Sequence, residues 1–340
     1  MALSEASAHS AITVPERVIP VPSSLSPEAQ AALSRAAVPA FAYPPLNDAA
    51  AWRQLVRAAN EGLLAQLEML AAATPDSVPP PTETIRAAEA DVFVITPPNA
   101  DREDPRILLE VHGGGLIVGA GKCCAAMGAF TAARLGLRTW AVDYRMPPDH
   151  PYPAGVDDCL AAYRALLELR SPEEIIVSGI SAGANLAAAL ILRARDEGLP
   201  APACAVLLTP QADLTESGDS FVTNLGIDIN LTQSLKPAGL LYAAGTDLRD
   251  PYVSPLFADF TRGFPPALLA TGTRDLLLSS TVQLHQALRA AGREADLHVL
   301  EAMPHGFLPG TPEDQHLVGQ IRDFIDMHAT AKAPPSPAAG

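Results

Sequence analysis

The chain has 340 residues, of which 48% are hydrophobic and 18% are charged, and its formal net charge is -15 at pH 7. This composition supplies enough apolar side chains for a buried core and excludes an intrinsically disordered chain. The acidic balance, without clusters of Lys and Arg, excludes a surface built to bind nucleic acid.

The cysteines and the start of the chain favour a cytoplasmic location. Cys123 and Cys124 are adjacent, Cys159 and Cys204 stand apart, and no C-x-x-C spacing indicates a metal or redox site. The first residues lack the basic start and apolar stretch of a secretory signal. No apolar run of the sequence reaches the roughly 18 residues that span a membrane. We therefore expect a cytoplasmic protein with free thiols and no membrane partner.

Residues 1–83 predict an N-terminal helical cap that ends in a linker. Ser26 is a good helix N-cap and Pro27 suits the first helical position, so residues 26–37 predict a short helix. In residues 49–73 leucines recur at helical spacing and form one apolar stripe. The following segment, up to Glu83, is rich in proline, which a helix interior does not tolerate.

Residues 84–330 predict one α/β domain. Short apolar runs alternate with segments of helical pattern, which is typical of a mostly parallel sheet with helices on both faces. The predicted strands are DVFVIT, ILLEVH, TWAVDY, EIIVSG, ACAVLLT, ALLATGT and ADLHVLE. The predicted helices are residues 125–135, 156–169, 182–197, 280–291 and 313–328. Residues 211–264 are too long for a single crossover and predict a second cap or lid, and residues 331–340 predict a disordered tail.

The strongest motif is G-x-S-x-G at residues 179–183, which lies between a predicted strand and a predicted helix. This is the context of a nucleophile elbow, in which a strained turn exposes the serine hydroxyl. The glycines at both ends allow the neighbouring backbone to approach the turn closely. We therefore predict that Ser181 is a nucleophile, rather than part of a small-residue turn that only serves packing.

A run of three glycines follows His112 at the end of the strand ILLEVH. Such a run is by itself typical of a flexible turn. Here it lies upstream of the nucleophile elbow, where hydrolases with this elbow form their oxyanion hole. We predict that the backbone N–H groups of Gly113, Gly114 and Ala182 stabilise the oxyanion. We expect His112 to support the turn through hydrogen bonds rather than to act as a base.

A serine nucleophile of this kind works in a catalytic triad with an acid and a histidine base. In the chain order of such triads the nucleophile comes first, the acid second and the histidine last, and this order selects the acid and the base here. His305 lies between the last predicted strand and the last predicted helix, and Asp275 follows the strand ALLATGT by a short loop. A helix N-cap is the alternative role for Asp275. With these three residues the sequence predicts ester hydrolysis through an acyl-enzyme, with no metal and no organic cofactor.

Taken together, the motifs resemble the bacterial hormone-sensitive-lipase family (family IV) of esterases. The matching blocks are HGGG at 112–115, YRMPPDHPYPAGVDD at 144–158, GISAGANLA at 179–187, the Asp275 segment and HGF at 305–307. The resemblance implies an α/β-hydrolase fold with a sheet of about eight strands, a helical cap and carboxylesterase activity on short to medium acyl esters. The chain departs from the family pattern at Ile180, at Ala184, and at Ser279 and Ser280, where the family commonly has an acidic pair.

Two other functions are compatible with these motifs. A lactone hydrolase would use the same triad on a cyclic ester, and a non-catalytic small-molecule-binding protein would share the fold. The presence of His305 favours an enzyme over the binding protein. The expected partner is a small-molecule ester, and the expected assembly is a monomer or a homodimer.

Overall fold

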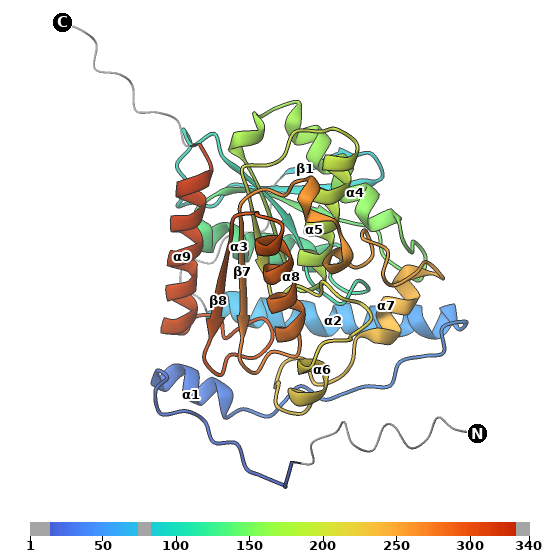
Figure 1. Ribbon diagram of the computed structural model, residues 1–340, viewed down its shortest axis with the longest axis vertical. Helices are drawn as coiled ribbons and strands as arrows, with labels where there is room; N and C mark the ends of the chain where they lie inside the picture. The colour runs from blue at the N-terminus through green and yellow to red at the C-terminus, as the bar shows by residue number, and fades with distance from the viewer. Residues whose placement is uncertain (1–13, 74–82, 331–340) are drawn as a thin grey trace, which may run out of the picture.

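The computed structural model describes residues 14–73 and 83–330, and in them an eight-stranded sheet forms the centre of the molecule (Figure 1). The strand order is β1-β2-β4-β3-β5-β6-β7-β8. β1 and β2 pair antiparallel, as do β2 and β4, while the other neighbours are parallel, which confirms the predicted mostly parallel sheet. The strands are β1 (Glu83–Ala87), β2 (Ala90–Ile95), β3 (Ile107–Val111), β4 (Arg138–Asp143), β5 (Ile175–Ile180), β6 (Cys204–Leu208), β7 (Ala267–Gly272) and β8 (Ala295–Leu300).

Helices cover both faces of this sheet. One face packs against α4, α5 and α8, and the other packs against α3 and α9. Within the described residues the helices are α1 (Pro27–Leu33), α2 (Ala49–Ala73), α3 (Lys122–Leu135), α4 (Ala154–Leu167), α5 (Ala182–Asp196), α6 (Ser220–Thr223), α7 (Lys236–Ala243), α8 (Leu278–Ala290) and α9 (Pro312–His328).

The central strands are apolar along their whole length because both of their faces are buried. Successive side chains of a strand point to opposite faces. Leu109 and Val177 therefore pack in the core under α4 and α5, whereas Leu108 and Ile176 pack in the core that includes α9. All four side chains are fully buried. The sheet thus forms a rigid platform whose loops can hold side chains in fixed positions.

Most predicted elements are present, with differences at the N-terminal side. The strand β1 was not predicted, because it follows the proline-rich stretch and its exposed residues Glu83 and Arg86 obscure its alternation. The first helix ends at Leu33 instead of residue 37. The predicted linker at residues 74–82 and the predicted tail at residues 331–340 lie outside the described residues.

The two N-terminal helices lie on different parts of the domain (Figure 1). The Ser26 hydroxyl caps α1 by accepting a hydrogen bond from the Ala29 amide at 3.1 Å, and it donates to the Glu313 carboxylate of α9 at 2.8 Å. In contrast, α2 packs beside α3, and its fully buried Trp52 contacts Ile117. Through this contact α2 reaches the loop that follows β3. The division of the chain into cap and catalytic domain stays a prediction.

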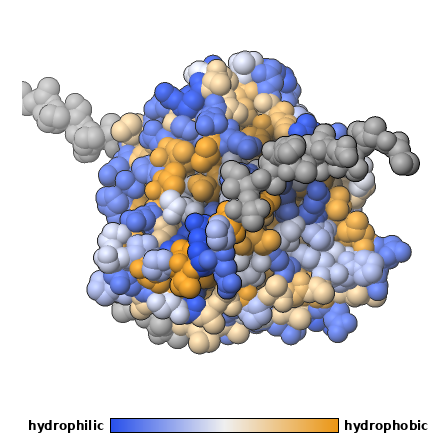
Figure 2. Space-filling view, turned by 60° about the horizontal axis from the view of Figure 1, so that its bottom comes forward, coloured by the Kyte–Doolittle hydropathy of each residue, from blue (hydrophilic) through white to orange (hydrophobic). Residues whose placement is uncertain are grey.

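The surface mixes polar and apolar side chains. Figure 2 shows hydrophobic patches interleaved with hydrophilic ones on one face. Apolar side chains exposed to solvent include Phe41, Val222 and Leu225. Such scattered exposure is normal for folded proteins. Among the described helices, none combines the length and the apolar character needed to cross a bilayer.

Substitutions of two helical glycines should change the free energy of unfolding in opposite directions. A Cβ on Gly128 of α3 would lie 2.5 Å from the Ala141 side chain, whereas a Cβ on Gly319 of α9 would meet nothing within 4 Å. Gly319→Ala should raise the free energy of unfolding by up to about 1 kcal/mol, since Ala favours a helix. Gly128→Ala should lower it by about 1–3 kcal/mol through overpacking. Urea denaturation measures both, and a stabilising effect of Gly128→Ala would contradict the packing of α3 on the sheet.

Candidate active site

Ser181 occupies a sharp turn between β5 and α5. Its backbone angles are φ 59° and ψ -121°, a conformation that is strained for any residue with a side chain. The turn is held by hydrogen bonds from Ser181 N–H to the Leu208 carbonyl at 2.8 Å and from the Gln211 amide to the Ser181 carbonyl at 3.1 Å. The neighbouring strand β6 and the segment after it therefore fix the serine in this conformation.

The glycines of the motif are required by space. A Cβ on Gly183 would lie 2.0 Å from the Val111 carbonyl oxygen of β3, and a Cβ on Gly179 would lie 2.4 Å from the Gly183 carbonyl oxygen. Either contact would force the backbone apart. The first turn of α5 therefore approaches β3 closely only because Gly183 lacks a side chain, and it folds back closely on β5 only because Gly179 lacks one.

The structure brings Ser181, His305 and Asp275 into one chain of hydrogen bonds. His305 Nε2 lies 2.9 Å from Ser181 Oγ, and His305 Nδ1 lies 3.0 Å from Asp275 Oδ1. The Asp275 side chain is fully buried, while that of His305 is 14% exposed. This is the geometry in which an imidazole can take a proton from the serine hydroxyl while the carboxylate orients the ring.

Further groups hold the Asp275 carboxylate in place. The Thr271 hydroxyl donates to Oδ2 at 2.8 Å, and the Leu277 amide donates to Oδ1 at 2.8 Å. The second contact is a local turn two residues long, because the N-cap position of α8 is Leu277, whose side chain makes no capping hydrogen bond. The alternative role of Asp275 as a helix N-cap is therefore not found. Thr271 was not singled out from the sequence, where it is one more residue of a buried strand.

The environment tunes His305 toward its charged form. Burial alone would lower the pKa of this imidazole, but the charge and hydrogen bond of Asp275 and the charge of Asp228 raise it above its ordinary value of 6.5. A raised pKa means that the ring accepts a proton more readily. His305 is thus suited to the role of a general base.

The glycine loop after β3 lies against the nucleophile. A Cβ on Gly113 would lie 3.4 Å from Ser181 Cβ. His112 Nδ1 is 2.7 Å from the Gly113 carbonyl oxygen, and Tyr144 donates from its hydroxyl to the His112 carbonyl at 2.9 Å. Because the peptide unit is planar and trans, the N–H of Gly114 points away from the Gly113 carbonyl. His112 thus supports the turn, as the sequence predicted.

Helix α2 holds this loop from the other side. The Gly119 amide donates to Asn60 Oδ1 at 2.7 Å, and Cys123 Sγ lies 3.3 Å from the Asn60 carbonyl oxygen. In the sequence Asn60 is one polar residue of a long amphipathic helix, and nothing there marks it as functional.

The serine pair that departs from the family pattern also has a structural role. Ser279 Oγ accepts from the Ser220 amide at 2.9 Å. Ser280 Oγ accepts from the Ala212 amide at 2.8 Å and donates to the Pro210 carbonyl at 2.8 Å. These hydroxyls fasten the start of α8 to residues 210–220. Neutral hydroxyls, which both donate and accept, fulfil this role without a buried charge.

One group among the described residues has the atoms to hold a metal ion. A ring nitrogen of His112, Cys124 Sγ and a carboxylate oxygen of Asp143 lie within 4.8 Å of one another. His112 already bonds the Gly113 carbonyl, and Asp143 accepts from the Gly121 amide at 2.9 Å. The three ligands are one fewer than the protein ligands of a structural zinc site. The triad chemistry uses none of them.

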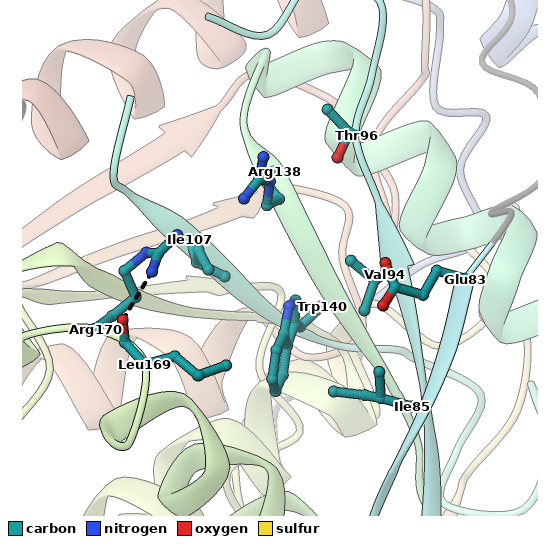
Figure 3. Close-up of a pocket in the computed structure, with 9 residues that line it drawn as sticks. All are labelled: Glu83, Ile85, Val94, Thr96, Ile107, Arg138, Trp140, Leu169 and Arg170. Atoms are coloured by element: carbon teal, nitrogen blue, oxygen red, sulfur yellow. Dashed lines mark hydrogen bonds between the residues drawn. The ribbon is translucent and has the colours of Figure 1, made fainter. Parts of the chain in front are cut away.

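A separate cavity of about 370 Å³ lies at the amino ends of the parallel strands, opposite to the end that carries Ser181, His305 and Asp275 (Figure 3). Ile107 and Arg138, the first residues of β3 and β4, line it together with Trp140 and Arg170. Arg170 is turned back to the Leu169 carbonyl, to which it donates at 2.7 Å. Ser181, in contrast, follows the carboxyl end of β5, where ligands of α/β sheets bind. This cavity is therefore distinct from the triad.

Comparison with known proteins gives consistent matches. A family model described as "alpha/beta hydrolase fold" matches residues 108–309. An acetyl-hydrolase from Streptomyces hygroscopicus is 36% identical over 229 residues, which are 66% of this chain and 76% of that protein. An esterase from Acinetobacter venetianus is 31% identical over 225 residues, covering 64% of this chain and 74% of that protein.

Solved structures agree with these matches. The crystal structure of one esterase superposes with a TM-score of 0.86 at 33% identity, covering 94% of this chain and 99% of the other. A second, an esterase from the bacterial hormone-sensitive lipase family, gives a TM-score of 0.71 at 29% identity, covering 85% of this chain and 100% of the other.

His112 and His305 should titrate at well-separated pH values. Burial lowers the pKa of His112 to about 4, with its hydrogen bond to Gly113 opposing the shift, whereas the pKa of His305 lies above 6.5. NMR of histidine-labelled protein, assigned with His305→Gln, should show His305 charging first as the pH falls and His112 remaining neutral well below pH 6. If both rings titrated together near 6.5, the burial of His112 and the pairing of His305 would be wrong.

Proposed function

The chain belongs to the bacterial hormone-sensitive-lipase family of α/β-hydrolases and is a carboxylesterase, and we propose that Ser181, His305 and Asp275 carry out its reaction. The observation that supports these roles is the hydrogen-bonded chain from Ser181 Oγ through both nitrogens of His305 to Asp275. Its partners come from three separate loops, all at the carboxyl ends of parallel strands.

The first half of the proposed reaction forms an acyl-enzyme. Ser181 Oγ attacks the carbonyl carbon of the ester while His305 Nε2 takes the hydroxyl proton. The carbonyl oxygen becomes an oxyanion and accepts hydrogen bonds from the N–H groups of Gly113, Gly114 and Ala182. The intermediate then collapses, the ester C–O bond breaks, and His305 gives its proton to the leaving alcohol.

The second half reverses these roles with water. His305 takes a proton from a water molecule that attacks the acyl carbon, and the same N–H groups stabilise the second oxyanion. Ser181 leaves with the proton returned by His305, and the carboxylic acid is released. Throughout both halves, Asp275 keeps the ring in the tautomer whose Nε2 faces the serine.

The proposed substrates are esters with short to medium acyl chains. This range comes from the family resemblance, and the acetyl-hydrolase relative is named for a short acyl group. The relatives and structural neighbours are esterases and acetyl-hydrolases, so neither a lactone hydrolase nor a non-catalytic binding protein is favoured. The cytoplasmic location and the monomeric or homodimeric state stay predictions, to be checked by fractionation and size-exclusion chromatography.

Initial rates on p-nitrophenyl esters from acetate to palmitate test the proposal. Wild-type protein should hydrolyse the short esters fastest, and Ser181→Ala should lose at least about a thousandfold in kcat, because the nucleophile is gone. Ser34→Ala, which removes an exposed hydroxyl directly after α1, is the control and should keep full activity. Retention of activity in Ser181→Ala would exclude Ser181 as the nucleophile.

A further inference from the structure

A single turn of the chain is bonded to both loops that carry the proposed acid and base. It comprises residues 224–230, here called the triad strap, and lies between α6 and α7 within the long irregular segment. Sequence patterns gave no role to any of its residues. In the folded protein its polar side chains face the segments around Asp275 and His305.

Asp228 is the centre of the triad strap. Its Oδ2 accepts hydrogen bonds from the Leu276 amide at 2.9 Å and from the His305 amide at 3.1 Å. Its Oδ1 accepts from the Asn230 amide at 2.9 Å and from the Leu231 amide at 3.0 Å. Asp228 is only 1% exposed. Through Oδ2, Asp228 thus connects Leu276, which follows the proposed acid Asp275, to the proposed base His305.

Two asparagines complete the contact from the same turn. Asn224 Nδ2 donates to the Asp275 carbonyl at 2.8 Å and to the Thr273 carbonyl at 3.2 Å. Asn230 Nδ2 donates to the His305 carbonyl at 2.6 Å. The loop that carries Asp275 (the acid loop) and the loop that carries His305 (the base loop) are therefore both held by the same short segment, through their backbone N–H and C=O groups.

Resting on the proposed function, we propose that Asp228 is a positioning residue of the esterase, which locks the acid loop to the base loop and places a second negative charge beside His305. It acts through His305 and touches no substrate atom. A buried carboxylate is costly unless it is well bonded, and the four N–H groups around Asp228 offset that cost. The structure thus maintains a buried charge where the reaction forms an imidazolium.

The electrostatics agree with this role. The charged groups that face the His305 ring are Asp275 and Asp228, and both raise its pKa against the effect of burial. In turn, burial raises the pKa of Asp228, while the charge of His305 and the backbone N–H groups oppose that rise. Neutralising Asp228 should therefore lower the pKa of His305.

The decisive experiment compares Asp228→Asn with Asp213→Asn. Asp213 is a matched control because it is also 1% exposed, lies in the same irregular segment and accepts four hydrogen bonds. Its partners, Thr215 and Ser217, belong to its own turn and not to the triad loops. For each variant, kcat and KM on p-nitrophenyl acetate are measured from pH 5 to 9, beside thermal unfolding.

Asp228→Asn should lose about ten- to a hundredfold in kcat, because small misplacements of catalytic groups have effects of this size. Its KM should change little, and the acid limb of its kcat/KM profile should move to lower pH. Asp213→Asn should keep the wild-type limb. Equal kcat values and equal limbs in the two variants would overturn the proposal.

Two further measurements keep the outcome unambiguous. If Asp228→Asn does not fold, Asn230→Ala tests the triad strap alone. This variant should lower kcat several-fold and leave the acid limb of the pH profile in place, because Asn230 is uncharged. An unchanged kcat would overturn the proposed role of the triad strap. Loss of activity in Ser181→Ala is established first. A failure of the proposed function would appear there, and a failure of Asp228's role would appear only in the comparison with Asp213→Asn.

Discussion

The hydrogen-bonded chain from Ser181 Oγ to His305 and on to Asp275, with steps of 2.9 and 3.0 Å, is the interaction on which the rest of the structure depends. Its members follow β5, β8 and β7, so its geometry is set by the relative positions of three strands. A rigid sheet buried on both faces fixes those positions. The strain of the Ser181 backbone is tolerated because β6 and α5 determine the turn.

The site also depends on close approaches between segments of backbone. Gly183 lets α5 lie against β3, and Gly272 lets the end of β7 lie against the Met303 carbonyl in the base loop. Around these contacts, polar side chains join loops that are distant in sequence. Asn60 reaches from α2 to the glycine loop, and Asp228 reaches to both sides of the triad. The active site is thus supported by elements that carry none of its chemistry.

Sequence reasoning found the α/β-hydrolase fold, which is confirmed, and it selected the residues that the structure places in one hydrogen-bonded chain. It succeeded there because each of these residues follows a strand and the motif order is fixed. It missed β1, whose exposed charged residues hide the alternation, and it missed Asn60 and Asp228. Their roles arise only when an amphipathic helix and an irregular turn fold against distant loops, and no local pattern encodes such contacts.

In the proposed reaction Ser181 forms a covalent bond with the acyl group during each turnover. An organophosphate p-nitrophenyl ester tests it most directly, because the activated serine displaces p-nitrophenolate and stays phosphorylated. Peptide mass spectrometry after such treatment should find one adduct per chain, on Ser181, together with complete loss of esterase activity. Inactivation with the adduct on another residue, or full activity with Ser181 modified, would contradict the account.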